Sequence, residues 1–202
     1  MAATALSAQP QVVHSTGSVT LYTQFQHAPP PVVLDSIKAE LQSIMSLTGN
    51  QFAWRSVAGV HGDEVVTQLA VVTFMGRCDT VGIAAHPVVP GPLGRTHVSN
   101  GEVLPFSEVN CDGIRDFVQC GLLSIRPKDR EDAYGRAVAR VLAHELYHVL
   151  AKTVHHGAYG VGKAAFSTRD LLGTTFVLEE SELERVRASN VFPMVETDNS
   201  TR

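Results

Sequence analysis

The sequence predicts a single α/β domain, and this expectation rests on chain length and on the order of strand and helix patterns. A chain of 202 residues is long enough for one full core and too short for two. Hydrophobic residues make up 44% and charged residues 18% of it, as in ordinary globular proteins. Strand-like segments lead into one long amphipathic helix and a shorter last helix. We expect the domain to span 18–190, between a flexible N-terminal segment (1–17) and a C-terminal tail (191–202).

The first half of the chain alternates between β-forming and helical patterns. SVTLYTQF (18–25) alternates and is rich in β-formers, which predicts a strand. In VVLDSIKAELQSIMSL (32–47) apolar residues recur at helical spacing, Pro31 suits a first helical turn, and TGN follows as a stop signal. The next predicted strands are QFAWRSV (51–57) and TQLAVVTFMG (67–76), and the second is apolar enough for the centre of a sheet.

The second half begins with a predicted hairpin and ends in helices. RTHVS (95–99) and EVLPFSEVN (102–110) flank Asn-Gly, which favours a tight hairpin turn. DGIRDFVQCGLL (112–123) predicts a short helix. The long helix should run over about 129–153, with an apolar stripe facing the sheet and an acidic first turn that suits the helix dipole. LEESELERVRAS (178–189) predicts the last helix.

Charge and hydropathy exclude several classes of partner. The net charge is -4 and no lysine or arginine cluster is present, so we expect neither nucleic acid nor an anionic membrane as a partner. No apolar run reaches the roughly 18 residues of a transmembrane helix. MAATALSAQP lacks the basic start and apolar middle of a signal peptide but resembles the small-residue end of one. This slightly favours a secreted or periplasmic location.

The segment AHELYH in the long helix carries the motif H-E-x-x-H, with His144, Glu145 and His148. On a helix, positions i and i+4 lie about 40° apart, so both imidazoles can bind one zinc ion. Glu145 lies about 100° round from His144, where it can reach a water on the metal without binding the metal itself. The motif therefore predicts zinc hydrolase chemistry with Glu145 as general base. The alternative is a set of polar residues on a solvated helix face.

A catalytic zinc usually takes three protein ligands, and His155 and His156 are the candidates for the third. On an unbroken helix His155 would lie about 10 Å further along the axis than His148, too far to share the ion. The helix must therefore break, and the glycines of HGAYGVGKAAFSTRD (156–170), a segment without a regular pattern, favour a break. Gly157 would help the chain turn just after His156, so we prefer His156 and keep His155 as the alternative.

With these features the chain resembles the metzincin-type zinc metalloproteases, in particular bacterial proteins with HELYH on the active-site helix. In that family a strand, a helix and four more strands precede the active-site helix. The resemblance implies a zincin-like α/β domain with a mixed, mostly parallel, twisted sheet. It also implies a zinc-dependent endopeptidase with one catalytic Zn²⁺ and a peptide or protein substrate. His144 and His148 would be ligands, Glu145 the base, and a histidine just after the helix the third ligand.

The chain departs from the metzincin pattern H-E-x-x-H-x-x-G-x-x-H at two positions. Ala151 stands where the glycine should be and Val154 where the third histidine should be. Met194 is the only methionine downstream that could form a methionine turn beneath the metal.

The resemblance suggests substrate contacts as well. RTHVS would lie at the sheet edge over the cleft and could pair with an extended substrate backbone. His97 on this strand is expected to be a surface histidine, and a position facing the cleft is the alternative. Tyr159 is expected to be a plain loop tyrosine, and a hydrogen bond to a developing oxyanion is the alternative. Tyr147, inside the motif, is expected to be a core or helix-surface aromatic.

Three cysteines allow at most one internal disulfide. In a metzincin-like sheet, 67–76 and 102–110 would be parallel neighbours, with Cys78 and Cys111 at the same end. A disulfide between them is then possible, conditional on export. Cys120 would be unpaired and buried on a helix.

Two other functions stay open. In a gluzincin-type zinc hydrolase the third ligand is a glutamate, and Glu179, Glu180 and Glu182 on the last helix are the candidates. The other function is that of a catalytically inactive protein that keeps zinc for structure or for binding a partner. Glu145 argues against it, because a purely structural zinc site has no use for an unbound carboxylate beside the ion.

Overall fold

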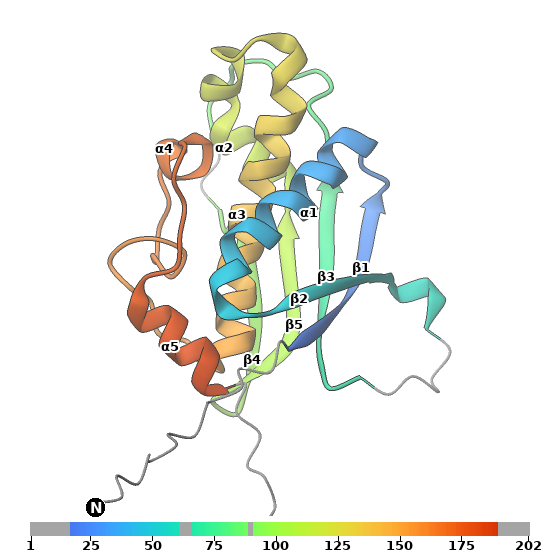
Figure 1. Cartoon of the computed structure of the whole chain (residues 1–202). Coiled ribbons are helices and arrows are strands. Elements are labelled where there is room, and N and C mark those ends of the chain that lie inside the picture. The colour runs from blue at the N-terminus through green and yellow to red at the C-terminus, as the bar shows by residue number, and fades with distance from the viewer. Residues whose placement is uncertain (1–16, 61–65, 89–90, 190–202) are drawn as a thin grey trace, which may run out of the picture.

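The computed structural model describes residues 17–60, 66–88 and 91–189, and it has the predicted α/β fold with a mixed, twisted five-stranded sheet (Figure 1). The strands are β1 (Ser18–His27), β2 (Gln51–Ser56), β3 (Gln68–Arg77), β4 (Gly94–Ser99) and β5 (Glu102–Asn110). Their order is β2-β1-β3-β5-β4, and only β4 is antiparallel to its neighbour. The sheet is therefore mostly parallel, and β4 is an edge strand.

The helices lie close to their predicted ranges. They are α1 (Pro31–Met45), α2 (Cys111–Leu123), α3 (Arg130–Ala151), α4 (Thr168–Leu172) and α5 (Glu180–Ser189). After α1 the chain tightens into a 3-10 turn and leaves it through Gly49, which has a φ of 78°. The sequence does not predict α4, which falls at the end of the segment expected to be irregular. Ser167 and Asp170 form a capping box at its start, and this local pair of hydrogen bonds explains the short helix.

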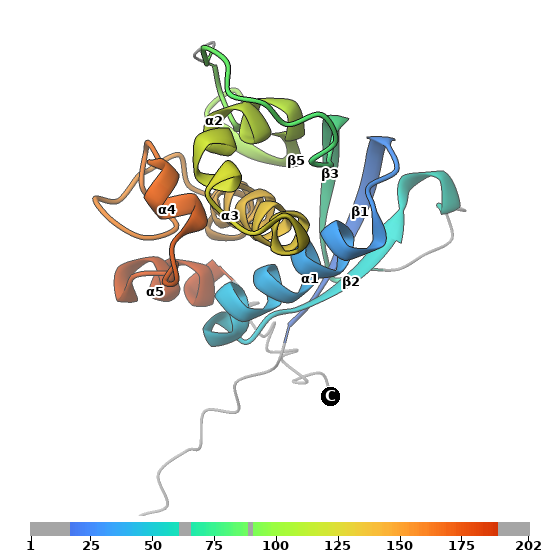
Figure 2. The same cartoon turned by 90° about the horizontal axis from the view of Figure 1, so that it is seen from above.

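The core lies between the sheet and the pair α1 and α3, which run side by side on one face of the sheet (Figures 1 and 2). Helix α3 is buried over most of its length. It approaches α1 closely at Gly135, where a Cβ atom would lie 2.6 Å from the Cβ of Ser36. Arg140 of α3 donates to the Glu40 carboxylate of α1 at 2.7 Å, which pairs the charge of this buried guanidinium. This packing fixes the rotation of α3 and hence the face that its motif presents.

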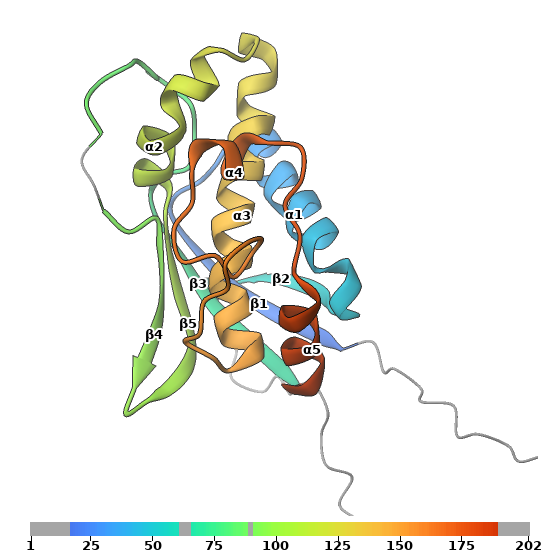
Figure 3. The ribbon, with the colours of Figure 1, turned by 90° about the vertical axis from the view of Figure 1, so that its left-hand side faces the viewer.

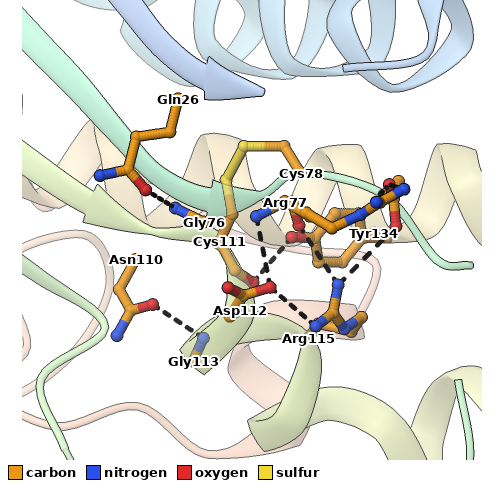
Figure 4. Close-up of a disulfide and its surroundings, with 11 residues drawn as sticks. Gln26, Gly76, Arg77, Cys78, Asn110, Cys111, Asp112, Gly113, Arg115 and Tyr134 are labelled. Atoms are coloured by element: carbon orange, nitrogen blue, oxygen red, sulfur yellow. Dashed lines mark hydrogen bonds and ion pairs between the residues drawn. A yellow bond between two sulfur atoms is a disulfide. The ribbon is translucent and has the colours of Figure 1, made fainter. Parts of the chain in front are cut away.

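A disulfide ties α2 to the sheet (Figure 4). Cys78 follows β3, and Cys111 is the first residue of α2, so the pairing suggested by the resemblance is present. The carbonyl of Cys111 also accepts a hydrogen bond of 2.8 Å from Tyr134 of α3. Cys120 is unpaired, as expected, but the expectation that it is buried is wrong. Gln119 takes the inward position on α2, and a step of about 100° along the helix places Cys120 in solvent.

The termini bound the described fold. The predicted N-terminal segment (1–17), apart from Gly17, and the predicted tail (191–202) lie outside the described residues, as does Met194. Over the ranges that the structure describes, no helix has the length and apolarity to cross a membrane.

Candidate metal centre

The C-terminal half of α3 carries His144, Glu145 and His148, and each has a side chain that is almost fully buried. The two histidines are one helical turn apart, and their Nε2 atoms lie 3.1 Å from each other. Two ligand atoms of a tetrahedral zinc with bonds of about 2.0–2.1 Å would be roughly 3.3 Å apart. The helix thus presents the two nitrogens at a separation that suits one metal ion.

Backbone carbonyls decide which ring nitrogen of each histidine is free. His144 donates from Nδ1 to the carbonyl of Val161 at 2.7 Å, and His148 donates from Nδ1 to the carbonyl of Thr153 at 2.8 Å. A carbonyl only accepts, so both protons lie on Nδ1 and both Nε2 lone pairs point at each other. Burial lowers the pKa of both histidines, that of His144 to about 4. Both rings are therefore neutral at pH 7, and a shared cation removes the repulsion between their lone pairs.

The third histidine comes from the post-helix loop (residues 152–163). Helix α3 ends at Ala151, its C-cap Lys152 has a left-handed φ of 48°, and the chain then turns back. The ring of His156 lies 5.3 Å from that of His144 and 4.8 Å from that of His148, between centroids. One nitrogen from each of these three rings lies within 4.8 Å of the others, so the group could hold a metal ion. His155 is exposed and is not part of the group.

Strand β4 positions Glu145. Thr96 donates from Oγ1 to Oε2 of Glu145 at 2.7 Å. Gly94 allows the close approach, because a Cβ atom there would lie 2.6 Å from Oε1 of Glu145. Burial raises the pKa of Glu145 to about 7, although the hydrogen bond from Thr96 acts in the opposite direction. The carboxyl group can therefore take up and release a proton near neutral pH.

The three histidines and Glu145 line one side of a cleft of about 680 Å³. Its walls come from β4, α2, α3 and the segment after α3, and Figure 3 shows the β4–β5 hairpin on one side of α3 and α5 on the other. The lining combines the polar metal centre with apolar side chains, among them Phe117, Val141 and Phe166. The edge strand RTHVS does border this cleft, as the resemblance implies.

The alternative that His97 faces the cleft is wrong, and the default of a surface histidine holds. Side chains alternate along a strand, and because Thr96 faces α3, His97 projects from the other side of the sheet. There its Nε2 lies 3.3 Å from Oε1 of Glu108. Tyr159 is 72% exposed and does not line the cleft, which agrees with the expected loop tyrosine and not with the alternative oxyanion contact. Tyr147 is fully buried, which confirms that it is a core aromatic.

The glutamates considered as alternative ligands are not part of the three-histidine group. Glu182 is fully buried, and its two oxygens accept hydrogen bonds of 2.9 Å from the backbone N–H groups of Gly162 and Glu179. None of Glu179, Glu180 and Glu182 joins the three-histidine group found in the described part of the chain.

The sequence did not predict the roles of Gly94, Thr96 or the carbonyls that hold the histidines. Alternation in 95–99 could have paired Gly94 with Thr96, but it could not show which face turns to the helix.

No family model matches this chain, and no curated protein is significantly similar to it.

Proposed function

We propose that this protein is a metzincin-like, zinc-dependent endopeptidase in which Glu145 is the general base. The observation that carries the proposal is the position of the three histidines beside a buried carboxyl group on one side of a cleft. A histidine triad with a neighbouring glutamate that is not itself a ligand suits a catalytic zinc site, which needs an open coordination position and a base. The order of the strands, with β4 at the edge over the cleft, supports the metzincin-like assignment.

His144, His148 and His156 would hold the zinc through neutral imidazoles. When bound, zinc would lower the pKa of a water and polarise the substrate carbonyl. Three nitrogen ligands favour zinc over magnesium or calcium, which prefer oxygen ligands. The hydrogen bonds from Nδ1 of His144 and His148 fix the ring orientations and add to the basicity of the ligand nitrogens.

Glu145 would move the protons of the reaction. As a carboxylate it would accept a proton from water, and as a carboxylic acid it would donate that proton to the departing amine nitrogen. Thr96 holds the carboxylate in place, and Gly94 leaves room for it. The buried surroundings of Glu145 limit competing contacts with bulk water.

The cleft favours an extended peptide. Strand β4 is an edge strand, so its outer backbone groups can pair with a substrate strand. Phe117, Val141 and Phe166 supply apolar surface beside the metal centre. We therefore expect cleavage next to bulky apolar residues in peptides or proteins.

The alternatives have less support. In the gluzincin-type hydrolase Glu182 would have to leave two backbone N–H groups in order to bind zinc. A structural or partner-binding zinc site gives no reason for Gly94 and Thr96 to accommodate the carboxyl group of Glu145.

The test is hydrolysis of a mixed peptide library, followed by mass spectrometry of the new peptide ends. We expect cleavage by the zinc-loaded protein, loss with a chelator, and return on adding zinc. Glu145→Gln should bind zinc and cleave about 10²–10⁴-fold more slowly. His155→Ala is the matched control and should cleave at the unmutated rate. If the zinc-loaded protein cleaves no faster than Glu145→Gln, the peptidase proposal fails and a binding role takes its place.

A further inference from the structure

The post-helix loop reaches all three histidines of the metal centre. Its residue Thr153 holds His148 through a backbone carbonyl, and Val161 holds His144 in the same way. Between these two contacts the loop supplies His156 itself. The shape of one short segment therefore sets the orientation of two rings and the position of the third.

Three backbone N–H groups donate hydrogen bonds that help to hold the second half of this loop in shape. The N–H of Gly157 donates to the carbonyl of Gly162 at 2.7 Å, which closes the loop behind His156. The N–H of Val161 donates to the carbonyl of Val177 at 3.1 Å. The N–H of Gly162 donates to Oε1 of Glu182 at 2.9 Å. The last bond ties the loop to α5, which lies far along the chain from the motif.

Glu182 is an unusual anchor because its carboxyl group is fully buried. Burial of a carboxylate is costly unless hydrogen bonds satisfy it, and each of its oxygens accepts one backbone N–H. Gly162 leaves the space that the carboxylate needs, because a Cβ atom there would overlap with Oε1. The bond from the Glu179 N–H caps the start of α5, and such a cap would form equally well on the surface. The burial of Glu182 therefore indicates a role for its other contact, with Gly162 of the loop.

The same helix also reaches His148, through Tyr147. Arg185 of α5 donates to the hydroxyl of Tyr147 at 3.1 Å. The ring of Tyr147 lies beside that of His148, with 5.5 Å between centroids. Helix α5 is thus connected to both helical histidines, to His144 through Glu182 and the loop and to His148 through Tyr147.

We propose that Glu182 is a positioning residue for the metal centre: by holding Gly162 it fixes the adjacent Val161 carbonyl, which orients His144. This inference rests on the proposed zinc site. Glu182 does not touch the ion; it acts through the loop. Its effect on His144 should exceed its effect on His148, because Thr153 closely follows α3 and is tied to it by its own N–H, which donates to the carbonyl of His148.

The test compares Glu182→Ala and Glu182→Gln with Val186→Ala, one turn further along the buried face of α5. Zinc affinity is measured by competition with a coloured chelator. We expect Glu182→Ala to bind zinc roughly 10–100-fold more weakly, as for other residues that support ligands. Glu182→Gln keeps one acceptor oxygen and should lie between Glu182→Ala and the unmutated protein. Val186→Ala should lower stability and leave zinc affinity within about twofold.

A second readout needs no zinc. In the metal-free protein, the Nδ1–H protons of His144 and His148 are followed by NMR. In Glu182→Ala the Nδ1–H proton of His144 should exchange with water, while the Nδ1–H proton of His148 stays protected. If Glu182→Ala does not fold, Glu182→Gln replaces it, and there the exchange at His144 should be faster than in the unmutated protein but slower than expected for Glu182→Ala. The proposal is overturned if folded Glu182 variants keep the His144 signal and zinc affinity, or if Val186→Ala weakens zinc equally. If the unmutated protein binds no zinc, the proposed function fails, and the NMR comparison still decides the role of Glu182.

Discussion

The proposed metal centre joins two parts of the chain that are held in different ways. The helix-borne half (His144, Glu145 and His148) lies on α3, and its side chains are only 5–7% exposed. The loop-borne half (His156 with the post-helix loop) is exposed at the histidine and depends on hydrogen bonds to Val177 and Glu182. The first half is fixed by the same packing that forms the core. The second lies outside the regular helices and strands, so we expect changes in it to affect metal affinity more than stability.

The largest effect on stability should come from the framework around the helix-borne half. The disulfide of Cys78 and Cys111 closes a loop with a sequence separation of 33. Replacing both cysteines by alanine should lower the free energy of unfolding by about 3–4 kcal/mol, measured with denaturant. Cys120→Ala, at an exposed position, is the control and should change it by less than about 0.5 kcal/mol. Equal losses in both proteins would contradict the assigned role of the disulfide.

Two glycine variants separate the halves directly. Gly160 has a φ of 63°, and a Cβ atom there would clash with the backbone carbonyl of Val177. Gly160→Ala should therefore distort the loop and weaken zinc binding about tenfold or more. Gly135→Ala crowds Ser36 at the α1–α3 contact and should cost about 1–3 kcal/mol of stability. Its zinc affinity should stay within about twofold. The comparison between the halves is wrong if Gly135→Ala weakens zinc binding more than Gly160→Ala.

A smaller effect is expected where β4 meets the helix-borne half. Thr96→Val keeps the shape of the side chain and removes the hydrogen bond to the Glu145 carboxylate. Loss of such a bond costs about 1.5–3 kcal/mol when the partner is charged, so peptide hydrolysis should slow at least about tenfold. Zinc content should not change. Thr73→Val, on the opposite face of the sheet, should cleave at the unmutated rate. An equal loss of activity in Thr73→Val would contradict the role given to the contact between Thr96 and Glu145.

The smallest effect concerns the end of the loop-borne half, where Lys163 pairs with Asp170 at 2.7 Å. Burial alone would raise the pKa of Asp170, but hydrogen bonds from Lys163 and Ser167 outweigh it and lower the pKa to about 2. The ionised form is favoured by folding, so this stability is complete above the ordinary pKa of 3.8 and is lost as the pH falls toward 2.

Asp170→Asn should therefore cost about 1 kcal/mol at neutral pH, from the lost capping and ion-pair contacts. The variant and the unmutated protein should converge in stability below about pH 2, as followed by denaturant unfolding. A difference that stays constant from pH 7 to pH 2 would show that the charge of Asp170 is not involved.

The contrast between the halves also explains what the sequence could predict. Strand alternation and helical spacing are local signals, and they located all five strands and α3 within a few residues. The same spacing placed His144 and His148 on one face. Helix α4 was missed because a capping box in a five-residue helix gives no periodic signal.

Positions that depend on long-range contacts were harder to predict. His156 was preferred over His155 on the turn expected at Gly157, and the structure places His156 with the other histidines. The sequence left open whether His97 faces the cleft, because the phase of its strand is set by the contact of Thr96 with α3. Glu182 was considered only as a ligand, because sequence spacing carries no sign of its bond to Gly162.

The most direct test of the central claim is the zinc content per chain, measured by elemental analysis of the unmutated protein, His156→Ala and His155→Ala side by side. We predict about one zinc per chain in the unmutated protein and in His155→Ala, and its loss after dialysis in His156→Ala. Loss in His155→Ala with retention in His156→Ala would contradict the assigned third ligand. Protein purified with zinc present that still carries none would contradict the metal centre itself.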